Sequence, residues 1–184
     1  MRLPVLRPVE LDDRQRELYD HIVDGPRSSG PRLSSLTDPD GGLVGPFNAM
    51  LFAPTVGEAW QAVGVAVRYA TSLTDRAREL AILAVAHHWD SAFERRAHEA
   101  IGRSVGLSEE EIEALRSGAE PALDDPTERA VLEVARALLT RGDLDDEEFA
   151  EARAALGLPA LVELSTLVGY YGTLAMQMRI FRVS

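Results

Sequence analysis

The stretch "RELAILAVAHHWDSAFERRAHEA", from Arg78 to Ala100, determines how the rest of the chain is interpreted. Its first part, Leu80 to Ala86, is apolar at every position, so a helix there has no solvent face and must be buried at the centre of the fold. The second part starts at Ser91, and Glu94 follows three residues later, which is the capping-box pattern of a helix start. The stretch therefore predicts two consecutive helices, of which the first is buried on all sides.

Capping and periodicity signals extend this helical pattern over most of the chain. Asp12 or Asp13 begins an amphipathic N-terminal helix, and Asp145, with Glu148 three residues later, begins another by the capping-box pattern. Signals for strands are weak, and no internal repeat is evident. The sequence therefore predicts an all-α fold, a helical bundle with an N-terminal helical arm. Besides the helix that begins at Ser91, helices are expected near residues 11–23, 46–54, 56–70, 75–88, 108–118, 125–141, 145–157 and 159–181.

The chain divides by composition into two parts. Residues 1–45 hold the arm helix and a connection rich in glycine and proline, and residues 46–184 hold the helical domain. From Gly25 to Pro46 the chain is interrupted repeatedly by glycine and proline, and irregular connections of this length are uncommon in compact domains. A lid over a binding site and a surface linker are equally good interpretations of this segment.

Composition argues against several classes of partner. The formal net charge of −11 and the pI near 4.8 disfavour nucleic acid and an anionic membrane as partners. No apolar run reaches the roughly 18–20 residues of a membrane span, and the first residues lack the apolar region of a secretory signal. A cytoplasmic location is expected.

Two residue types are absent altogether, and both absences limit the chemistry. The chain has no cysteine, which excludes disulfides, thiolate catalysis and cysteine-ligated metals. It also has no lysine, because all 19 basic residues are arginines, and this removes Schiff-base and P-loop lysine chemistry. Catalysis would therefore depend on hydroxyl, carboxylate or imidazole groups, or on a bound metal or cofactor.

Glu94 and His98 are the strongest candidates for catalysis. They are four residues apart on the expected helix, a spacing that places them on one face. At about 100° per residue, Glu94 falls within the apolar sector of this helix and His98 lies at its edge beside Ile101. Carboxylates are rarely buried without partners, so an inward-facing Glu–His pair indicates a lined pocket. A capped helix with a surface ion pair would have the same spacing.

Glu79 is a second carboxylate that faces inward. It lies near the start of the apolar helix and shares a stripe with Ile82. Glu79 either lines the pocket or is a buried structural acid whose charge is satisfied by Arg76, Arg78 or backbone donors. The structural interpretation is slightly favoured.

The stretch from Arg78 to Leu115 resembles the core of the carboxymuconolactone decarboxylase and alkylhydroperoxidase D superfamily. In the peroxidase branch of this superfamily, a glutamate on one helix is followed by C-x-x-C-x-x-x-H at the start of the next. On this chain the glutamate is Glu79, the cysteine positions hold Ser91 and Glu94, and the histidine is His98. The resemblance includes three further segments: "GPFNAML" (Gly45 to Leu51), "LTDRAREL" (Leu73 to Leu80) and "ELSTLVGYYG" (Glu163 to Gly172).

The absence of both thiols excludes dithiol peroxidase activity. The pattern Glu94-x-x-x-His98, after His88 and Trp89, resembles the non-redox, decarboxylase-like branch. The resemblance covers residues 46–183. It implies an alkylhydroperoxidase D-like helical bundle that assembles as a homotrimer or homohexamer, with active sites near the subunit contacts.

The function implied by the resemblance is cofactor-free decarboxylation of a small carboxylated lactone or cyclic acid, a carboxy-lyase reaction. It requires a dry pocket, stabilisation of enolate-like charge and a proton returned to carbon. His98 is the candidate proton donor, Glu94 would orient it and raise its pKa, and Arg68 would hold a substrate carboxylate. The other candidates for substrate binding are Glu79, His88, Trp89, Ser91, Asn48, Tyr170 and Tyr171, around an apolar pocket built from Phe47, Phe52 and Trp89.

Other functions remain open at this point. The same acid–base pair would serve an isomerase, a cyclase or a lactone-opening enzyme. The protein could also be non-catalytic, a ligand-binding or assembly module that keeps the fold but has lost the chemistry. A metal site built from Glu94 and His98 with His87, His88 or Glu79 is disfavoured, because there is no H-E-x-x-H pattern. We therefore expect no metal, no cofactor, a small carboxylated substrate, and a homo-oligomer.

Overall fold

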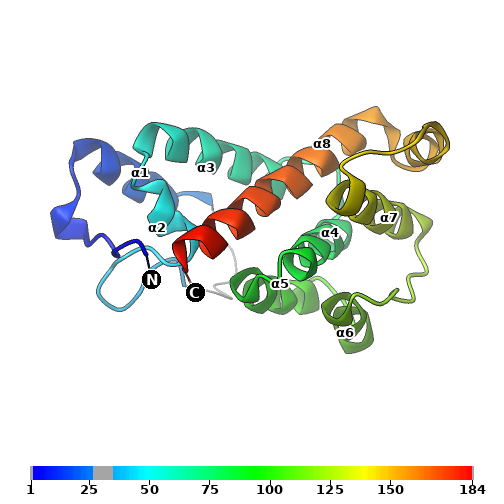
Figure 1. Ribbon diagram of the computed structural model, residues 1–184, viewed down its shortest axis with the longest axis horizontal. Coiled ribbons are helices and arrows are strands. Elements are labelled where there is room, and N and C mark those ends of the chain that lie inside the picture. Colours follow the sequence, from blue (N-terminus) through cyan, green and yellow to red (C-terminus); the bar gives the residue numbers. More distant parts are fainter. Residues whose placement is uncertain (1, 27–34, 184) are drawn as a thin grey trace.

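The computed structural model describes residues 2–26 and 35–183 (Figure 1). Within these residues the regular elements are helices, and the β-type contact is an isolated bridge between Thr37 and Leu43. The predicted all-α fold is therefore confirmed. A short 3-10 helix, η1, spans Pro8–Glu10, and the α-helices are α1 (Asp13–Val23), α2 (Pro46–Met50), α3 (Pro54–Tyr69), α4 (Asp75–His88), α5 (Ala92–Ser104), α6 (Glu109–Ser117), α7 (Pro126–Arg141) and α8 (Asp146–Phe181).

The helix α4 is the centre of the fold. Every residue from Leu80 to Ala86 is at most 5% exposed, because α5, α6, α7 and α8 all pack against α4. In Figure 1, α4 lies between α5 and α7, and α8 runs diagonally across the molecule. The apolar character of this stretch on every face is explained by its burial on every face, as the sequence predicted.

The helices begin at their capping residues. Asp12, rather than Asp13, is the N-cap of α1, and Thr74 is the N-cap of α4; each accepts a hydrogen bond from the backbone three residues later. Each such bond satisfies a donor that the first turn leaves free and contributes about 1 kcal/mol. The caps predicted at Ser91 for α5 and at Asp145 for α8 are confirmed, and Ser108 and Asp125 cap α6 and α7.

The long helix α8 has one interruption. Gly157 has φ 78° and ψ 162°, which is outside the helical region and is a conformation that glycine adopts without strain. Pro159 follows two residues later, in the first turn of the second helical segment, where a missing N–H is tolerated. The predicted boundary between two helices therefore exists at Gly157, although the two segments follow one another directly.

One window of α8 is long and apolar enough, by length and composition alone, to cross a membrane. The expectation that the chain has no such run is therefore wrong. Leu164, Leu167 and Leu174 on this helix are at most 3% exposed within the protein, and buried core helices meet the same criterion. Only 33% of the window is buried inside this chain, so α8 also presents apolar surface outward.

The N-terminal arm packs onto the helical domain. Leu18 and Ile22 of α1 are at most 1% exposed and lie in one apolar cluster with Leu51. Figure 1 shows α1 and α3 on the same side of α8, with the two chain ends close together. The arm and the domain thus share a core, and the division of the chain into residues 1–45 and 46–184 stays a prediction.

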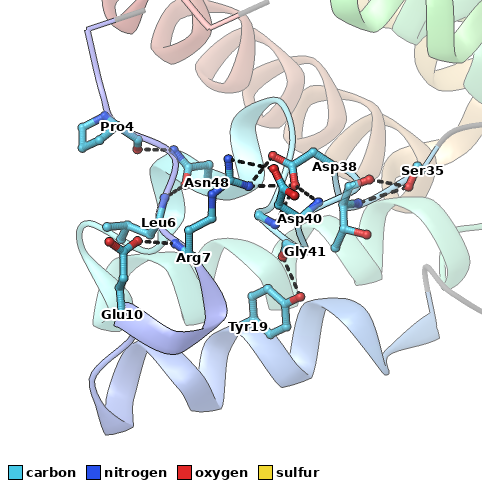
Figure 2. A network of polar contacts seen from close by, with 12 residues as sticks. Pro4, Leu6, Arg7, Glu10, Tyr19, Ser35, Asp38, Asp40, Gly41 and Asn48 are labelled. Carbon is cyan, nitrogen blue, oxygen red and sulfur yellow. Dashed lines mark hydrogen bonds and ion pairs between the residues drawn. The ribbon is translucent and has the colours of Figure 1, made fainter.

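The connection after α1 is tied back to the arm. Arg7 binds Asp38 at 2.7 Å, and the Tyr19 hydroxyl donates to the carbonyl oxygen of Gly41 at 2.8 Å (Figure 2). These contacts hold the part of the connection that immediately precedes α2. Residues 27–34 lie outside the described residues, so the lid and linker interpretations of that part stay predictions.

Gly45 provides a test of how α2 is positioned against α5. Its φ of 58° and ψ of −138° suit only glycine, and an added Cβ would overlap the ring of Phe93. We expect Gly45→Ala to lower the free energy of unfolding by about 3 kcal/mol through backbone strain and overpacking. Gly142→Ala is the control, because Gly142 has φ 73° and nothing within 4 Å of its added Cβ, and it should cost about 1 kcal/mol. Urea unfolding measures both, and equal losses would contradict the role of the Phe93 contact.

Candidate active site

A buried imidazole joins α4 to α5. His98 Nδ1 lies 2.6 Å from Glu79 Oε2, and His98 Nε2 lies 3.4 Å from Glu94 Oε2. All three residues are at most 4% exposed. Because a carboxylate is costly to bury without a partner, the imidazole between the two acids is what allows both of them to lie in the core.

The buried residues of α5 are Glu94, His98 and Gly102. Their spacing of four places them in one line along the helix. His98 therefore lies at the centre of the buried face, whereas the helix phase predicted that it lies at the edge of that face. The prediction was wrong because it centred the buried face on apolar residues, whereas α5 faces α4 with its polar line. The apolar residues beside this line are only half buried: Ala97, Ala100 and Ile101.

A cation and a phenol complete the cluster around His98. Arg68, from α3, donates a hydrogen bond from Nη1 to the Tyr171 hydroxyl at 3.1 Å, and the same nitrogen lies 3.4 Å from His98 Nε2. Tyr171, from α8, packs its ring edge against the imidazole, with ring centroids 5.1 Å apart. Four helices, α3, α4, α5 and α8, therefore contribute side chains around one histidine.

The electrostatic surroundings favour the protonated form of His98. Burial by itself lowers the pKa of the imidazole, but the charge of Glu79 and the hydrogen bonds to Glu79 and Glu94 outweigh burial and the nearby Arg68. The pKa of His98 is therefore raised above its ordinary value of 6.5. Burial likewise lowers the pKa of Arg68, but Tyr171 and Glu79 reverse this effect, and the guanidinium stays charged.

The two neighbours of His98 Nε2 favour opposite protonation states. Glu94 accepts a hydrogen bond from Nε2–H of an imidazolium, whereas Arg68 Nη1 donates one to the lone pair of a neutral imidazole. Glu79 accepts from Nδ1–H in both states, so Nε2 is the atom that gains or loses the proton. The cluster is therefore arranged to hold and release one proton at a defined atom.

Two polar atoms of the cluster have no hydrogen-bond partner among the described residues. They are Glu79 Oε1, an acceptor, and Arg68 Nε, a donor, and both atoms are inaccessible to solvent. Buried polar atoms in proteins are nearly always paired. An unpaired acceptor and an unpaired donor beside a titratable histidine are therefore more typical of a reaction site than of a structural core.

The interpretation of Glu79 as an acid satisfied by Arg76 or Arg78 is wrong. Arg76 binds acids on α6 and α7, and Arg78 binds Asp75. The partner of Glu79 is His98, nineteen residues further along the chain. Glu79, named above as a possible substrate contact, thus lies inside the cluster and is the closest partner of its imidazole.

Asn48 and Tyr170 have structural partners. Asn48 is buried, and its side chain fixes the arm: Oδ1 accepts from Leu6 N at 3.1 Å, and Nδ2 donates to Pro4 O at 2.9 Å (Figure 2). Tyr170 is 1% exposed, stacks on Trp60 with centroids 5.4 Å apart, and packs edge-on against Tyr171 with centroids 5.2 Å apart. The structure gives both residues a structural role, and their part in substrate binding stays a prediction.

The remaining predicted residues lie around the turn between α4 and α5. His88 is exposed and contacts Trp89 edge-on, while Ser91 caps α5. Trp89 and Ser91 line a cavity of about 230 Å³. Phe47 is buried, whereas Phe52 is 42% exposed and does not line this cavity. This cavity therefore has Trp89 but neither phenylalanine in its lining, and the apolar pocket expected from all three residues stays a prediction.

The cavity has walls that the sequence interpretation did not identify. Phe93 and Arg96 come from α5, and Met178 and Arg179 come from the end of α8. The α5 pair could have been found, because both residues follow Ser91 within two turns of the same helix. The α8 pair is brought to the site by tertiary packing, which no local pattern specifies.

Within residues 2–26 and 35–183, no group of three or more His, Asp or Glu side chains is arranged to hold a metal ion. Glu79, Glu94 and His98 lie close together, but both imidazole nitrogens face carboxylates. These three side chains therefore bind one another.

The fold and the site define a class of protein: a cysteine-free, alkylhydroperoxidase D-like helical bundle with a buried histidine between two carboxylates. Residues 54–137 match the sequence model of the Carboxymuconolactone decarboxylase family, and this segment contains Arg68, Glu79, Glu94 and His98. The resemblance inferred from the sequence is thereby confirmed. Over this segment, which is a little under half of its length, the chain resembles the carboxymuconolactone decarboxylase family, and it lacks both cysteines of the peroxidase branch.

Two solved structures share the fold. An uncharacterised peroxidase-related protein from Ralstonia eutropha JMP134, described as an alkylhydroperoxidase AhpD core, is similar with a TM-score of 0.73 and 17% identity, over 97% of this chain and 88% of that chain. A protein of unknown function from Agrobacterium tumefaciens, proposed as an antioxidant defence protein AhpD, has a TM-score of 0.66 and 24% identity, over 74% of this chain and 94% of that chain. No curated protein matches the chain. At these identities the likeness establishes the fold alone.

Replacing Glu79 by Gln tests the electrostatic argument. The amide keeps an acceptor for His98 Nδ1 but removes the charge that favours the imidazolium, so we expect the pKa of His98 to fall. NMR titration of the histidine rings measures this pKa, with the His98 signal assigned from its loss in His98→Asn. Asp75→Asn is the control, because it removes an exposed acid from the same helix and should leave the pKa of His98 unchanged.

The pH dependence of the free energy of unfolding gives a second test of the interaction between His98 and Glu79. Because the pKa of His98 is raised on folding, its protonation stabilises the protein fully below about pH 6.5, and this contribution is lost as the pH rises through the raised pKa. Urea unfolding over a pH series should show this loss in the wild type and not in His98→Asn. The exposed His21 contributes equally in both. Parallel pH profiles, or an unchanged pKa in Glu79→Gln, would contradict the argument.

Proposed function

We propose that this protein is a cofactor-free carboxy-lyase that decarboxylates a small carboxylated lactone or cyclic acid by acid–base chemistry at His98. The observation that carries the proposal is the buried imidazole, held at Nδ1 by Glu79 and placed at Nε2 between Glu94 and Arg68. The family match supports decarboxylation over other proton transfers, because the family is named for this reaction. Dithiol peroxidase chemistry is excluded because the chain has no cysteine.

Arg68 would stabilise the charge that develops when carbon dioxide leaves. As the carbon–carbon bond to the carboxylate breaks, the electron pair stays on the substrate carbon and delocalises onto a conjugated carbonyl oxygen. Arg68 is a fixed cation within the cluster, and its Nε has no partner among the described residues. A preorganised donor aimed at such an oxygen typically lowers the barrier by about 3 kcal/mol.

His98 would return the proton to carbon. The imidazolium donates from Nε2, and the resulting neutral ring then accepts a hydrogen bond from Arg68 Nη1. Glu79 holds Nδ1–H throughout, so the ring keeps its orientation. Glu94, at 3.4 Å from Nε2, is placed to pass a proton from solvent back to that nitrogen, which closes the proton balance of the cycle.

The burial of the cluster also favours the first step. A carboxylate loses its charge as carbon dioxide forms, so a site that excludes water disfavours the charged substrate more than the transition state. Glu94 and Tyr171, which border His98, are at most 3% exposed. The substrate would exchange its hydration shell for the fixed dipoles and charges of this cluster.

We also propose that the protein works as a homotrimer or homohexamer. Helical spacing aligns four exposed apolar side chains on one face of the second segment of α8, two near each end, and this stripe is interrupted in the middle by serine, threonine and glycine. Exposed apolar surface marks interaction sites, and α3 beside it carries the exposed Val56. The residues of the α8 stripe are Leu158, Val162, Met176 and Ile180, which are 43–65% exposed.

Val162→Glu tests this assembly. A charge placed in a buried subunit contact is strongly destabilising, so the variant should sediment as a smaller species than the wild type in analytical ultracentrifugation. Val9→Glu is the control, because Val9 is an exposed apolar residue on the arm and lies outside the stripe. A monomeric wild type, or the same sedimentation for Val162→Glu and the wild type, would contradict the proposed interface.

Turnover of 4-carboxymuconolactone, followed by ultraviolet absorbance, tests the reaction. We expect His98→Asn to lower kcat by at least about 100-fold, because its amide still reaches Glu79 but cannot donate a proton to carbon. His21→Asn makes the same change at an exposed histidine on α1 and should retain wild-type kcat. Circular dichroism establishes that each variant is folded.

The outcomes distinguish an error in the assigned catalytic residue from an error in the assigned substrate. Equal turnover by the wild type and His98→Asn would show that the histidine is not needed and would overturn the site. No turnover by the wild type would reject this substrate for the protein. Isomerisation, cyclisation, lactone opening or a non-catalytic role would then take the place of decarboxylation.

A further inference from the structure

The exposed face of the second segment of α8 has a symmetric arrangement of side chains. Its bulky members are Leu158 and Val162 near one end, and Met176 and Ile180 near the other. Gly169 lies midway between the two pairs and is also exposed. Leu158 and Ile180 are each eleven residues from this glycine, and Val162 and Met176 are each seven residues from it. The pattern of large side chains is therefore the same in both directions along the helix.

The middle of this face consists of small residues. Ser165 and Thr173 lie four residues to either side of Gly169. Their hydroxyls donate to carbonyl oxygens of α8 itself, Ser165 to Val162 and Thr173 to Gly169, both at 2.9 Å, so neither donor requires a partner from outside. A Cβ atom added at Gly169 would have nothing within 4 Å. Small residues at this spacing allow two helices to approach closely, so this face suits a second helix that crosses α8 at Gly169.

The exposed surface of α8 and of the neighbouring α3 (Figure 1) carries little charge. Charged residues make up 27% of the chain, but among the exposed residues of α3 and of the second segment of α8 they are Glu58 and Arg179. Glu58 binds His21 of α1 at 2.9 Å, and Arg179 lines the cavity at the turn between α4 and α5. Depletion of charge is typical of the centre of a protein interface. The other exposed residues of α3 from Val56 onward are apolar: Val56, Ala59, Ala62, Ala66 and Tyr69.

The area of this surface is sufficient for a contact between two proteins. Val56 and Tyr69 of α3 and the four bulky residues of α8 are 43–65% exposed. A large side chain has about 200 Å² of surface, so these six residues together expose about 600 Å². Two copies packed through this surface would bury about 1,200 Å², which reaches the range of stable protein interfaces. The exposed alanines of α3 add to this area.

We propose that this surface is a two-fold interface, in which α8 of a second copy of the chain crosses α8 in the antiparallel direction at Gly169. In a two-fold contact the same patch is used by both copies and must be complementary to itself. The symmetric spacing meets this requirement, because it places Leu158 against Ile180 of the partner subunit and Val162 against the partner's Met176. The axes of crossed helices separate away from the crossing point, so small residues suit the middle and large residues suit the ends.

This inference deepens the homo-oligomer proposed above and rests on it. A two-fold contact requires an even number of copies, so it selects the homohexamer over the homotrimer. The interface is independent of the reaction proposed at His98, because it can be measured without turnover.

Disulfide trapping tests the proposal, because the chain has no cysteine of its own. The Cα atoms of facing residues in packed helices are about 5 Å apart, a distance that a disulfide spans. Mild oxidation should therefore convert most of the Gly169→Cys variant into a covalent dimer of the 20.1 kDa chain, seen on a gel without reducing agent. Ser117→Cys is the control, because it places a similarly exposed thiol at the end of α6, and it should stay uncross-linked.

Two further variants test the antiparallel register without changing Gly169. Val162→Cys alone should not cross-link, because two copies of this position would lie about 20 Å apart along crossed antiparallel helices, and the same holds for Met176→Cys alone. When the two variants are co-expressed, they should cross-link to each other. A parallel crossing would give the reverse result, with each variant cross-linking to itself.

The results separate the two-fold contact from the assembly as a whole. Self-cross-linking of Val162→Cys, equal cross-linking of Ser117→Cys and Gly169→Cys, or a wild type that sediments as a trimer would each overturn the proposal. If the wild type sediments as a larger oligomer but neither Gly169→Cys nor the co-expressed pair cross-links, the assembly stands and the two-fold contact fails. A monomeric wild type would overturn both and leave this face to another protein or to a membrane surface.

Discussion

The contact between His98 Nδ1 and Glu79 Oε2, 2.6 Å long and buried between α4 and α5, is the interaction on which the rest of the site depends. Glu79 directly precedes the buried apolar stretch from Leu80 to Ala86, and a carboxylate buried there is tolerated only with a charged or hydrogen-bonding partner. That partner comes from α5, so the contact fixes the rotation of α5 on α4. The same rotation then carries Glu94 inward and places the apolar residues of α5 to the side.

Most of the fold can be predicted because its signals are local. The seven apolar residues from Leu80 to Ala86 specify a buried helix, and side-chain caps such as Asp12 and Ser108 specify where neighbouring helices begin. The break at Gly157 is visible for the same reason. The apolar surface of α8 is harder to interpret, because its composition alone does not distinguish a core helix from a subunit contact or a membrane span.

The site was predicted less completely, because its contacts join distant parts of the chain. Glu94 and His98 could be paired from their spacing, but the closest partner of His98 is Glu79, on another helix. Nearby arginines were the simpler partners for Glu79 in sequence, and they are bound elsewhere. Arg68 and Tyr171 were named as separate candidates, and only the packing of α3 against α8 brings the Tyr171 hydroxyl to Arg68 Nη1, beside His98 Nε2.

The two positions that hold cysteines in the peroxidase branch show how the same framework supports different chemistry. Ser91 at the first position ends α4's turn as the N-cap of α5 and lines the cavity, and Glu94 at the second faces His98 Nε2. A dithiol exchanges electrons, whereas this chain has a serine, a carboxylate and a histidine flanked by two acids, which under the proposed function exchange a proton. Because the acids raise the pKa of His98 while Arg68 opposes them, the balance between these charges sets how readily His98 releases its proton.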